Sequence, residues 1–259
     1  MTTVTFSMAE VVRFAVVLMR VGGIMVFAPW FSSDSFPMQM RVVLTLIATL
    51  VLCPALPLAK IPADMGLIQI LSIGLGECLF GMVLGLAASF LFAGMQLGGQ
   101  IISFQLGFSI INLIDPQSQV EVSVISFLQH NLGLLFFLLI NGHHWFFLAV
   151  SDSFNYLPVG GVRLNGPVVE EVVRLSAQIL VFGLQLAAPV MTVTIVCDVV
   201  LGMIGRAAPQ INILIVGMPL KTLAGFFCMS VSYYFLPRLL GESYTALFHD
   251  LFALMHRMG

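Results

Sequence analysis

Long apolar stretches separated by short polar connections dominate this chain. A window of about 19 residues gives about six such stretches, near 11–30, 41–58, 67–96, 124–150, 174–205 and 218–240. At 1.5 Å per helical residue, stretches of this length suit a hydrocarbon core about 30 Å thick. The short alternating segments of a transmembrane β-barrel are missing from the sequence. The pattern therefore predicts an all-α, multi-helix integral membrane protein that crosses the membrane several times.

Composition supports this class and excludes others. Of the 259 residues, 59% are hydrophobic and only 8% are charged, whereas soluble domains carry about 25% charged residues. The formal net charge of -2 leaves no basic surface for phosphate backbones, so no nucleic-acid partner is expected. The apolar side chains need lipid or protein neighbours.

Four charged residues lie inside the apolar stretches. They are Arg13 and Arg20 in the first, Glu77 in the third and Asp198 in the fifth. Charges at membrane depth usually face protein or water. Arg20 and Glu77 are either members of structural ion pairs or side chains that reach the interface, and the sequence assigns a partner to neither.

Small residues and prolines interrupt the same stretches. Small side chains four residues apart allow close helix approach, and prolines predict kinks or helix ends. The small residues are Gly81, Gly85, Ser89, Gly94 and Gly98, and the prolines are Pro54, Pro57, Pro189, Pro219 and Pro237. The chain is therefore expected to pack against many neighbours.

The segment 97–122, together with Gln96, differs from the stretches around it. It is rich in uncharged amides and glycines, and Asp115 before Pro116 predicts a turn. Irregular backbone at membrane depth is tolerated where protein buries it or where it lines an aqueous cavity. The segment is also too apolar for a solvated loop. It is interpreted as a re-entrant element or plug, with an apolar extramembrane loop as the alternative.

Motifs for catalysis are missing. The sequence lacks GxSxG, a Walker-type GxxxxGK[ST] and HExxH. Ser126 and His130 are spaced like a nucleophile and base, but without an oxyanion motif helix packing is preferred. His143 and His144 are interpreted as an interfacial cap beside Trp145, with a metal or proton-relay role as the alternative. No enzymatic activity, cofactor or metal site is therefore expected.

A polar connection, GMIGRAAPQINILIVGMPLK, follows the fifth apolar stretch. Arg206 and Lys221 stand near its two ends, and positive residues beside short loops favour the cytoplasmic side. The candidate cytoplasmic-side residues are Arg206, Pro209, Gln210, Asn212 and Lys221.

Four sequence stretches carry a resemblance to a known family. They are RVGGIMVFAPWF at 20–31, FQLGFSIINLIDPQSQ at 104–119, NGHHWFFLAVSDSFNYLPVG at 141–160 and AAPVMTVTIVCDVVLGMIGRAAPQINILIVGMPLK at 187–221. In this order they resemble the FliR family of the flagellar type III export gate, whose relatives serve virulence injectisomes. The last stretch also resembles the small export protein FliQ.

The resemblance implies a fold and a domain organisation. Residues 1–173 would form a FliP-like helical part that includes the plug at 97–122, and residues 174–259 a FliQ-like helical hairpin. Such kinked hairpins pack in a larger helical pore assembly that contains one copy of this chain together with FliP-like and FliQ-like proteins. FlhB-like and FlhA-like components, unfolded export substrates and membrane lipids are the other expected partners.

The resemblance also implies a function. The chain would help to form and plug the inner-membrane channel for unfolded flagellar export substrates, as a multi-pass protein of the flagellar basal body. The implied plug residues are Gln105, Phe108, Ile111, Asp115, Pro116 and Gln117. Service in a virulence injectisome and a secondary transporter are the alternatives.

Overall fold

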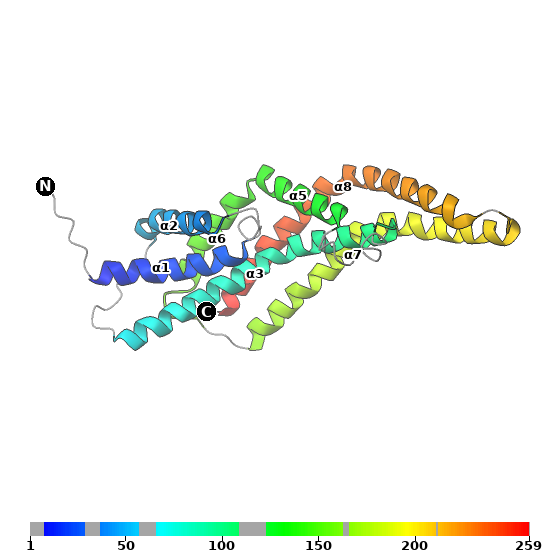
Figure 1. Ribbon diagram of the computed structural model, residues 1–259. Helices are drawn as coiled ribbons and strands as arrows, with labels where there is room; N and C mark the ends of the chain where they lie inside the picture. The colour runs from blue at the N-terminus through cyan, green and yellow to red at the C-terminus, as the bar shows by residue number, and fades with distance from the viewer. Residues whose placement is uncertain are drawn as a thin grey trace. The chain divides into compact units, whose positions relative to one another are not determined.

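Helices account for most of the computed structural model, which describes residues 8–28, 37–56, 66–108, 123–162, 166–210 and 212–258. No strand occurs within these ranges, which confirms the predicted all-α class. The helices, labelled in Figure 1, are α1 (Met8–Phe27), α2 (Met38–Ala55), α3 (Leu67–Gln105), α5 (Val124–Leu139), α6 (Gly142–Tyr156), α7 (Gly166–Ala207) and α8 (Ile213–Met258).

The helices that suit a membrane span are fewer than the apolar stretches. Among the described residues, three helices are long and apolar enough, Leu67–Gln105, Gly166–Ala207 and Ile215–Met258, or up to four if α5 and α6 count as one broken span. α1 contains Glu10, Arg13 and Arg20, and the apolar part of α2, Met38–Pro54, is shorter. Charge and length therefore separate α1 and α2 from the long helices.

The apolar stretch 124–150 is divided in the structure. The Ser123 side chain accepts hydrogen bonds from the amides of Ile125 and Ser126 and so begins α5. The helix ends before Asn141, whose φ of 57° lies in the left-handed region. Asparagine is among the few residues that adopt this conformation readily. Two helices thus replace the single predicted stretch.

The prolines occupy helix interiors more often than helix ends. Pro189 lies inside α7, and Pro219 and Pro237 lie inside α8. Pro54 stands one residue before the last residue of α2, and Pro57 lies outside the described residues. Proline is tolerated in membrane helices because neighbouring groups can satisfy the backbone carbonyl that it leaves free.

The chain forms two compact units, which are described separately. Unit 1 contains Met1–Phe90, Asn141–Ser176 and Thr245–Gly259, and unit 2 contains Leu91–Ile140 and Ala177–Tyr244. This grouping follows contacts in space, so the division of the sequence at residue 173 stays a prediction.

In unit 1, α1 packs against α2 and against the first part of α3 (Figure 1). Glycines bring the α1 and α3 backbones together, since a Cβ on Gly81 would stand 2.2 Å from the Arg20 carbonyl oxygen and one on Gly85 2.5 Å from that of Ile24. From α1, Gly23 makes the reciprocal approach to Cys78. The predicted close approach at Gly81 and Gly85 is confirmed and occurs within the chain.

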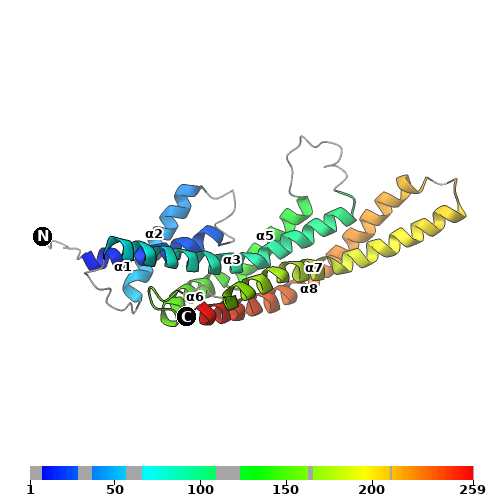
Figure 2. The ribbon, with the colours of Figure 1, turned by 90° about the horizontal axis from the view of Figure 1, so that it is seen from below.

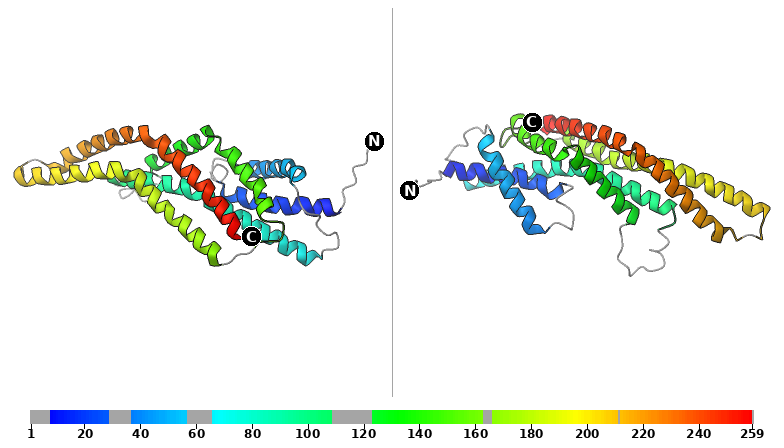
Figure 3. Two further views of the ribbon diagram at one scale, coloured as in Figure 1. Left: turned by 180° about the vertical axis from the view of Figure 1, so that it is seen from behind. Right: turned by 90° about the horizontal axis from the view of Figure 1, so that it is seen from above.

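In unit 2, the second part of α3 and α5 pack against the hairpin of α7 and α8, whose two helices run antiparallel (Figures 2 and 3). Gly94 and Gly98 of α3 face α7, where added Cβ atoms would lie 3.0 Å from Phe182 and 2.9 Å from Leu186. An apolar cluster binds the four helices together. Its buried members are Ile102, Leu106, Ile125, Ala187, Val190 and Met229.

Candidate functional site

The predicted plug segment is helical at its beginning. Residues 97–105 continue α3, so the helix extends past the expected end at residue 96. Gly98 and Gly99 do not loosen the backbone there, because they are positions of close helix contact. Gln105 is the last residue of α3 and is half-buried, and Phe108 is exposed. The other plug candidates, Ile111, Asp115, Pro116 and Gln117, lie outside the described residues.

A glycine turn ends α3 at the entry to the segment 109–122. Gly107 has a φ of 85°, its amide donates to the Phe104 carbonyl at 3.1 Å, and the Phe108 amide donates to the Ser103 carbonyl at 3.1 Å. These two hydrogen bonds form a Schellman motif with glycine in its left-handed position. The chain therefore leaves α3 in a defined geometry.

α8 holds this turn from the side. Leu106 is buried in the apolar cluster of unit 2, and the Thr222 hydroxyl donates to its carbonyl at 3.1 Å. The Phe108 ring meets the Phe226 ring edge to face, with centroids 5.8 Å apart. Gly225 allows Leu106 to pack closely against α8, since a Cβ on Gly225 would stand 2.1 Å from a methyl group of Leu106.

The exit from the segment is fixed against α3. Ser123 caps α5, and the Ser126 hydroxyl, fully buried, donates to the Gln96 carbonyl at 2.7 Å. Gly99 of α3 lies so close that an added Cβ would stand 2.4 Å from the Ser126 Cα. The described residues on both sides of the segment 109–122 are thus held within unit 2. We refer to Gly107, Phe108, Thr222, Ser123 and Ser126 as the anchor residues.

Ser126 and His130 are not arranged as a nucleophile and base. The Ser126 hydroxyl bonds the Gln96 carbonyl, whereas the His130 ring packs edge to face on Phe92, with centroids 6.1 Å apart. The helix-packing interpretation is therefore preferred on geometry as well as on sequence.

The two adjacent histidines are close to each other. The rings of His143 and His144 have centroids 4.9 Å apart, at the beginning of α6. Within the described residues, no group of three His, Cys, Asp or Glu side chains could hold a metal ion. A Trp145 contact with the Phe248 ring, at 6.2 Å between centroids, accompanies the pair.

The candidate cytoplasmic-side residues lie at and below the tip of the α7–α8 hairpin. Arg206 is in the last turn of α7, Pro209 and Gln210 are in the turn, and Asn212 precedes α8. Lys221 is inside α8, where its ammonium pairs with the Asp198 carboxylate of α7 at 2.6 Å. The structure thus separates Lys221 from the loop and gives Asp198 a partner within the chain.

In unit 1, the charges of the first and third apolar stretches meet. Arg20 of α1 and Glu77 of α3 form an ion pair, and both side chains are fully buried. The Arg20 guanidinium also donates to the Ser153 hydroxyl at 3.2 Å and to the Leu157 carbonyl at 3.1 Å. The second Glu77 oxygen accepts from the Gly160 amide at 3.0 Å.

Two aromatic rings complete the surroundings of Arg20. The guanidinium carbon lies 3.9 Å from the centroid of the Phe154 ring and 4.7 Å from that of Phe80, which is within the range of cation–π attraction. Sequence reasoning missed Ser153, Phe154 and Gly160 as partners. The sequence offered one usable signal, a pair of opposite charges in two apolar stretches. That signal does not indicate that α6 and the residues after it supply the other partners.

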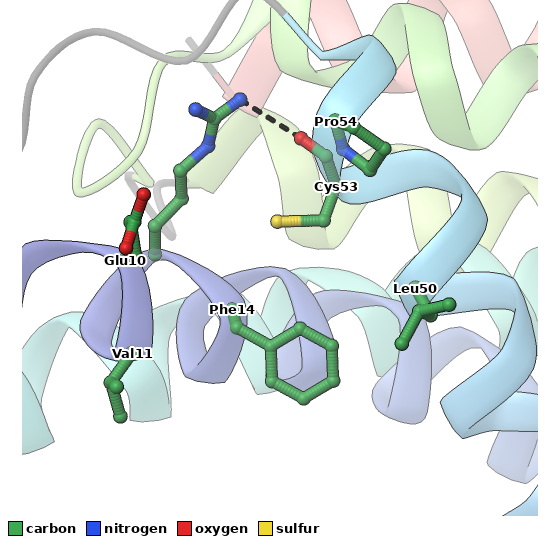
Figure 4. Close-up of a pocket in the computed structure, with 7 residues that line it drawn as sticks. Glu10, Val11, Phe14, Leu50, Cys53 and Pro54 are labelled. Atoms are coloured by element: carbon green, nitrogen blue, oxygen red, sulfur yellow. Dashed lines mark hydrogen bonds between the residues drawn. The ribbon is translucent and has the colours of Figure 1, made fainter. Parts of the chain in front are cut away.

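Arg13 has a separate structural role. Its guanidinium donates to the carbonyls of Cys53 at 2.9 Å and Leu56 at 2.7 Å, at the end of α2 (the dashed line in Figure 4 marks the first). Unpaired carbonyls at a helix C-terminus favour a cation. Arg13 and Cys53 border an open groove of about 590 Å³ between α1 and α2, with Phe14 and Leu50 on its walls (Figure 4).

Comparisons with known proteins cover most of the chain. The profile of the bacterial export proteins, family 1, matches residues 11–247. The flagellar biosynthetic protein FliR of Escherichia coli K12 is 31% identical over 238 residues, which are 92% of this chain and 89% of that protein. FliR of Bacillus subtilis 168 is 35% identical over 162 residues, 60% of this chain and 62% of the relative. The chain therefore belongs to family 1 of the bacterial export proteins, the family that contains FliR.

Proposed function

We propose that this chain is a non-enzymatic subunit of the flagellar type III protein export gate in the bacterial inner membrane. The observation that carries the proposal is the family match over residues 11–247, with relatives that are flagellar biosynthetic proteins. The apolar helices agree with a membrane location. The flagellar names of these relatives favour flagellar service over service in an injectisome.

The segment 109–122 is proposed to close the channel. The anchor residues hold the described residues on both sides of the segment on unit 2. The sequence of the segment, rich in isoleucine with amides and an Asp-Pro turn, suits a seal that is apolar without being a regular helix. Gln105, Phe108, Ile111, Asp115, Pro116 and Gln117 are the residues proposed to shape this plug.

The assembly with FliP-like and FliQ-like proteins is proposed from the resemblance and from the exposed apolar surface. Only 17% of the apolar window of α8 is buried within the chain, and 33% of that of α7. Such surfaces require lipid or protein contact. Residues 174–259, which contain most of both helices, are proposed to be the FliQ-like hairpin, with FlhB-like and FlhA-like components as further partners.

Deletion of residues 109–116 tests the plug directly. The deletion retains Phe108 and Ser123, so the anchor residues and the cluster of unit 2 stay intact. We expect an ion leak across membranes that contain the assembled gate, measured as conductance in planar bilayers, with normal recovery of the complex. Replacement of the same residues by a glycine-serine stretch of equal length is the control for loop length, and it should leak as well. Unchanged conductance of the assembled deletion variant would refute the plug.

A further inference from the structure

The groove between α1 and α2 in unit 1 is open and mainly apolar. Val11 and Phe14 of α1 and Leu50 and Pro54 of α2 supply its apolar side chains (Figure 4). Its volume of about 590 Å³ is typical of a small-molecule site, whereas a stable protein interface buries about 800 Å² on each partner. The groove therefore suits a single ligand chain or headgroup better than the face of a partner helix.

The positive charge of Arg13, which lines the groove, is not balanced by the groups that it bonds. Both of its hydrogen bonds use Nη2 and go to the carbonyls of Cys53 and Leu56, which carry only partial negative charge at the end of α2. Its Nε atom is buried and has no hydrogen-bond partner. A guanidinium has five N–H donors, so an anion beside Arg13 would accept from donors that the two bonds to α2 do not use.

The groove also offers acceptors for a positive group. Glu10, three residues before Arg13 on α1, brings a carboxylate to the same lining. Pro54 has no N–H, so the Leu50 carbonyl lacks the donor that a helix would supply four residues further on. Among the described lining residues, the Cys53 thiol is the one further donor, and a thiol is a weak donor. Groups that attract an anion and groups that attract a cation thus meet at one end of α1.

An exposed apolar stripe on α2 continues from the groove. Val43, Ile47 and Leu50 are spaced four and three residues apart, so they lie on one face of the helix. Their exposed fractions are 48%, 53% and 67%. At 1.5 Å per residue the stripe is about 10 Å long. An apolar chain that leaves the groove at Leu50 would therefore find an apolar path along α2.

These features select the chemistry of an occupant. A hydrocarbon matches the walls but neither charge. A fatty acid or a phospholipid without an amine matches the walls and Arg13, but it places no positive group beside Glu10. A phospholipid with an amino headgroup combines an acyl chain, a phosphate and, a short link away, an ammonium with N–H donors. It matches the walls and both charged side chains at once.

We propose that the groove between α1 and α2 binds a phospholipid whose headgroup carries a primary ammonium, with its phosphate beside Arg13 and its ammonium beside Glu10. Its acyl chain lies against Leu50 and follows the stripe along α2. The inference goes beyond the proposed function, because the site needs a membrane but no partner subunit.

A photoactivatable phosphatidylethanolamine with a diazirine in one acyl chain tests the site. The full chain is placed in phosphatidylcholine nanodiscs that contain a small fraction of this probe and is irradiated, and mass spectrometry locates the adducts. We expect adducts on residues 10–14 and 43–54. Unlabelled phosphatidylethanolamine should compete about tenfold better than phosphatidylglycerol, which has a phosphate but no ammonium. Diacylglycerol, which has neither group, should not compete.

Three variants separate the shape of the groove from its charge. Leu50→Trp fills the apolar part, leaves both charges in place and should remove the adducts that phosphatidylethanolamine competes away. Val42→Trp is the matched control, because Val42 is also exposed on α2 but does not line the groove; it should leave them unchanged. Glu10→Gln retains the bonds of Arg13 to α2 and should remove the preference for phosphatidylethanolamine over phosphatidylglycerol.

The contrary outcomes are distinct from failure of the proposed function. Equal competition by the three lipids, adducts spread evenly over the exposed helices, or adducts that Leu50→Trp leaves unchanged would overturn the lipid site. So would adducts that disappear when the chain is assembled with the FliP-like and FliQ-like proteins, since a partner would then cover the groove. None of these results bears on membership of the export gate, and failure to assemble would not remove the lipid site.

Discussion

Single charged residues inside the apolar stretches find their partners within the chain. Arg20 pairs with Glu77, Asp198 with Lys221, and Arg13 bonds the last carbonyls of α2. Lone charges in an apolar environment are costly, which is why such groups pair. The charges in the stretches are therefore contacts within this protein and not the first places to look for subunit contacts.

Removing one charge of the buried Arg20–Glu77 pair is expected to destabilise the protein more than removing both charges. Arg20→Met leaves the Glu77 carboxylate buried without its partner, and we expect a loss of about 3–5 kcal/mol in the free energy of unfolding. The double variant Arg20→Met with Glu77→Met removes both charges and should recover most of this loss. Unfolding of the purified chain in mixed micelles measures both. A double variant as unstable as the single one would contradict this account.

Gly81 is expected to tolerate no side chain. A Cβ there would stand 2.2 Å from the Arg20 carbonyl oxygen, so Gly81→Ala should force α1 and α3 apart at a cost of about 1–3 kcal/mol. Gly202→Ala is the matched control, because it also lies inside a long helix but has no atom within 4 Å of an added Cβ. It should be neutral or stabilise the chain by about 0.5–1 kcal/mol. Equal effects of the two changes on thermal unfolding would refute the close contact.

These residues show what the sequence could and could not predict at this scale. Spacing four apart indicated that Gly81 and Gly85 permit close approach, because helix periodicity is local. The ion-pair partner of Arg20 is 57 residues away in the sequence. Ser153, whose hydroxyl accepts another hydrogen bond from Arg20, is 133 residues away. Pairing over such separations depends on which helices pack together, and apolar periodicity alone does not determine that.

Individual helices were predictable from apolar runs, but their ends were not. Amides and glycines at 97–105 indicated irregular backbone, whereas the structure continues α3 through them. The glycines are required because α5 and α7 approach α3 closely at Gly98 and Gly99. In the other direction, the apolar run 124–150 concealed the helix break at Asn141. Helix packing, which the sequence does not display, overrode local preference at 97–105. At Asn141, by contrast, a residue that readily adopts the left-handed conformation ends the helix inside an apolar run.

The end of α3 depends on one glycine conformation. Gly107→Ala should cost about 1–2 kcal/mol, since its φ of 85° is unfavourable for a residue with a Cβ. The amides of Gly107 and Phe108, which donate to Phe104 and Ser103, should exchange hydrogen faster in the variant. Gly107→Asn is the control, because asparagine adopts this conformation more readily. Exchange in Gly107→Ala as slow as in the parent chain would show that the turn does not fix the start of the segment 109–122.

At the scale of the whole molecule, the apolar surface is larger than the chain can bury by itself. Long exposed apolar faces run along α2, α7 and α8, including Leu50, Val196, Val199, Leu223 and Phe227. Lipid and partner helices are equally apolar, so hydropathy does not distinguish them. The proposed assembly with partner subunits therefore depends on the family match and not on hydropathy.

The composition of the complex that contains the chain tests the proposed function most directly. We predict that the chain, purified in mild detergent from cells that express the FliP-like and FliQ-like proteins, is recovered with both in one stable complex that contains a single copy of it by native mass spectrometry. Recovery as a lone monomer that transports a small substrate on its own would contradict the central claim.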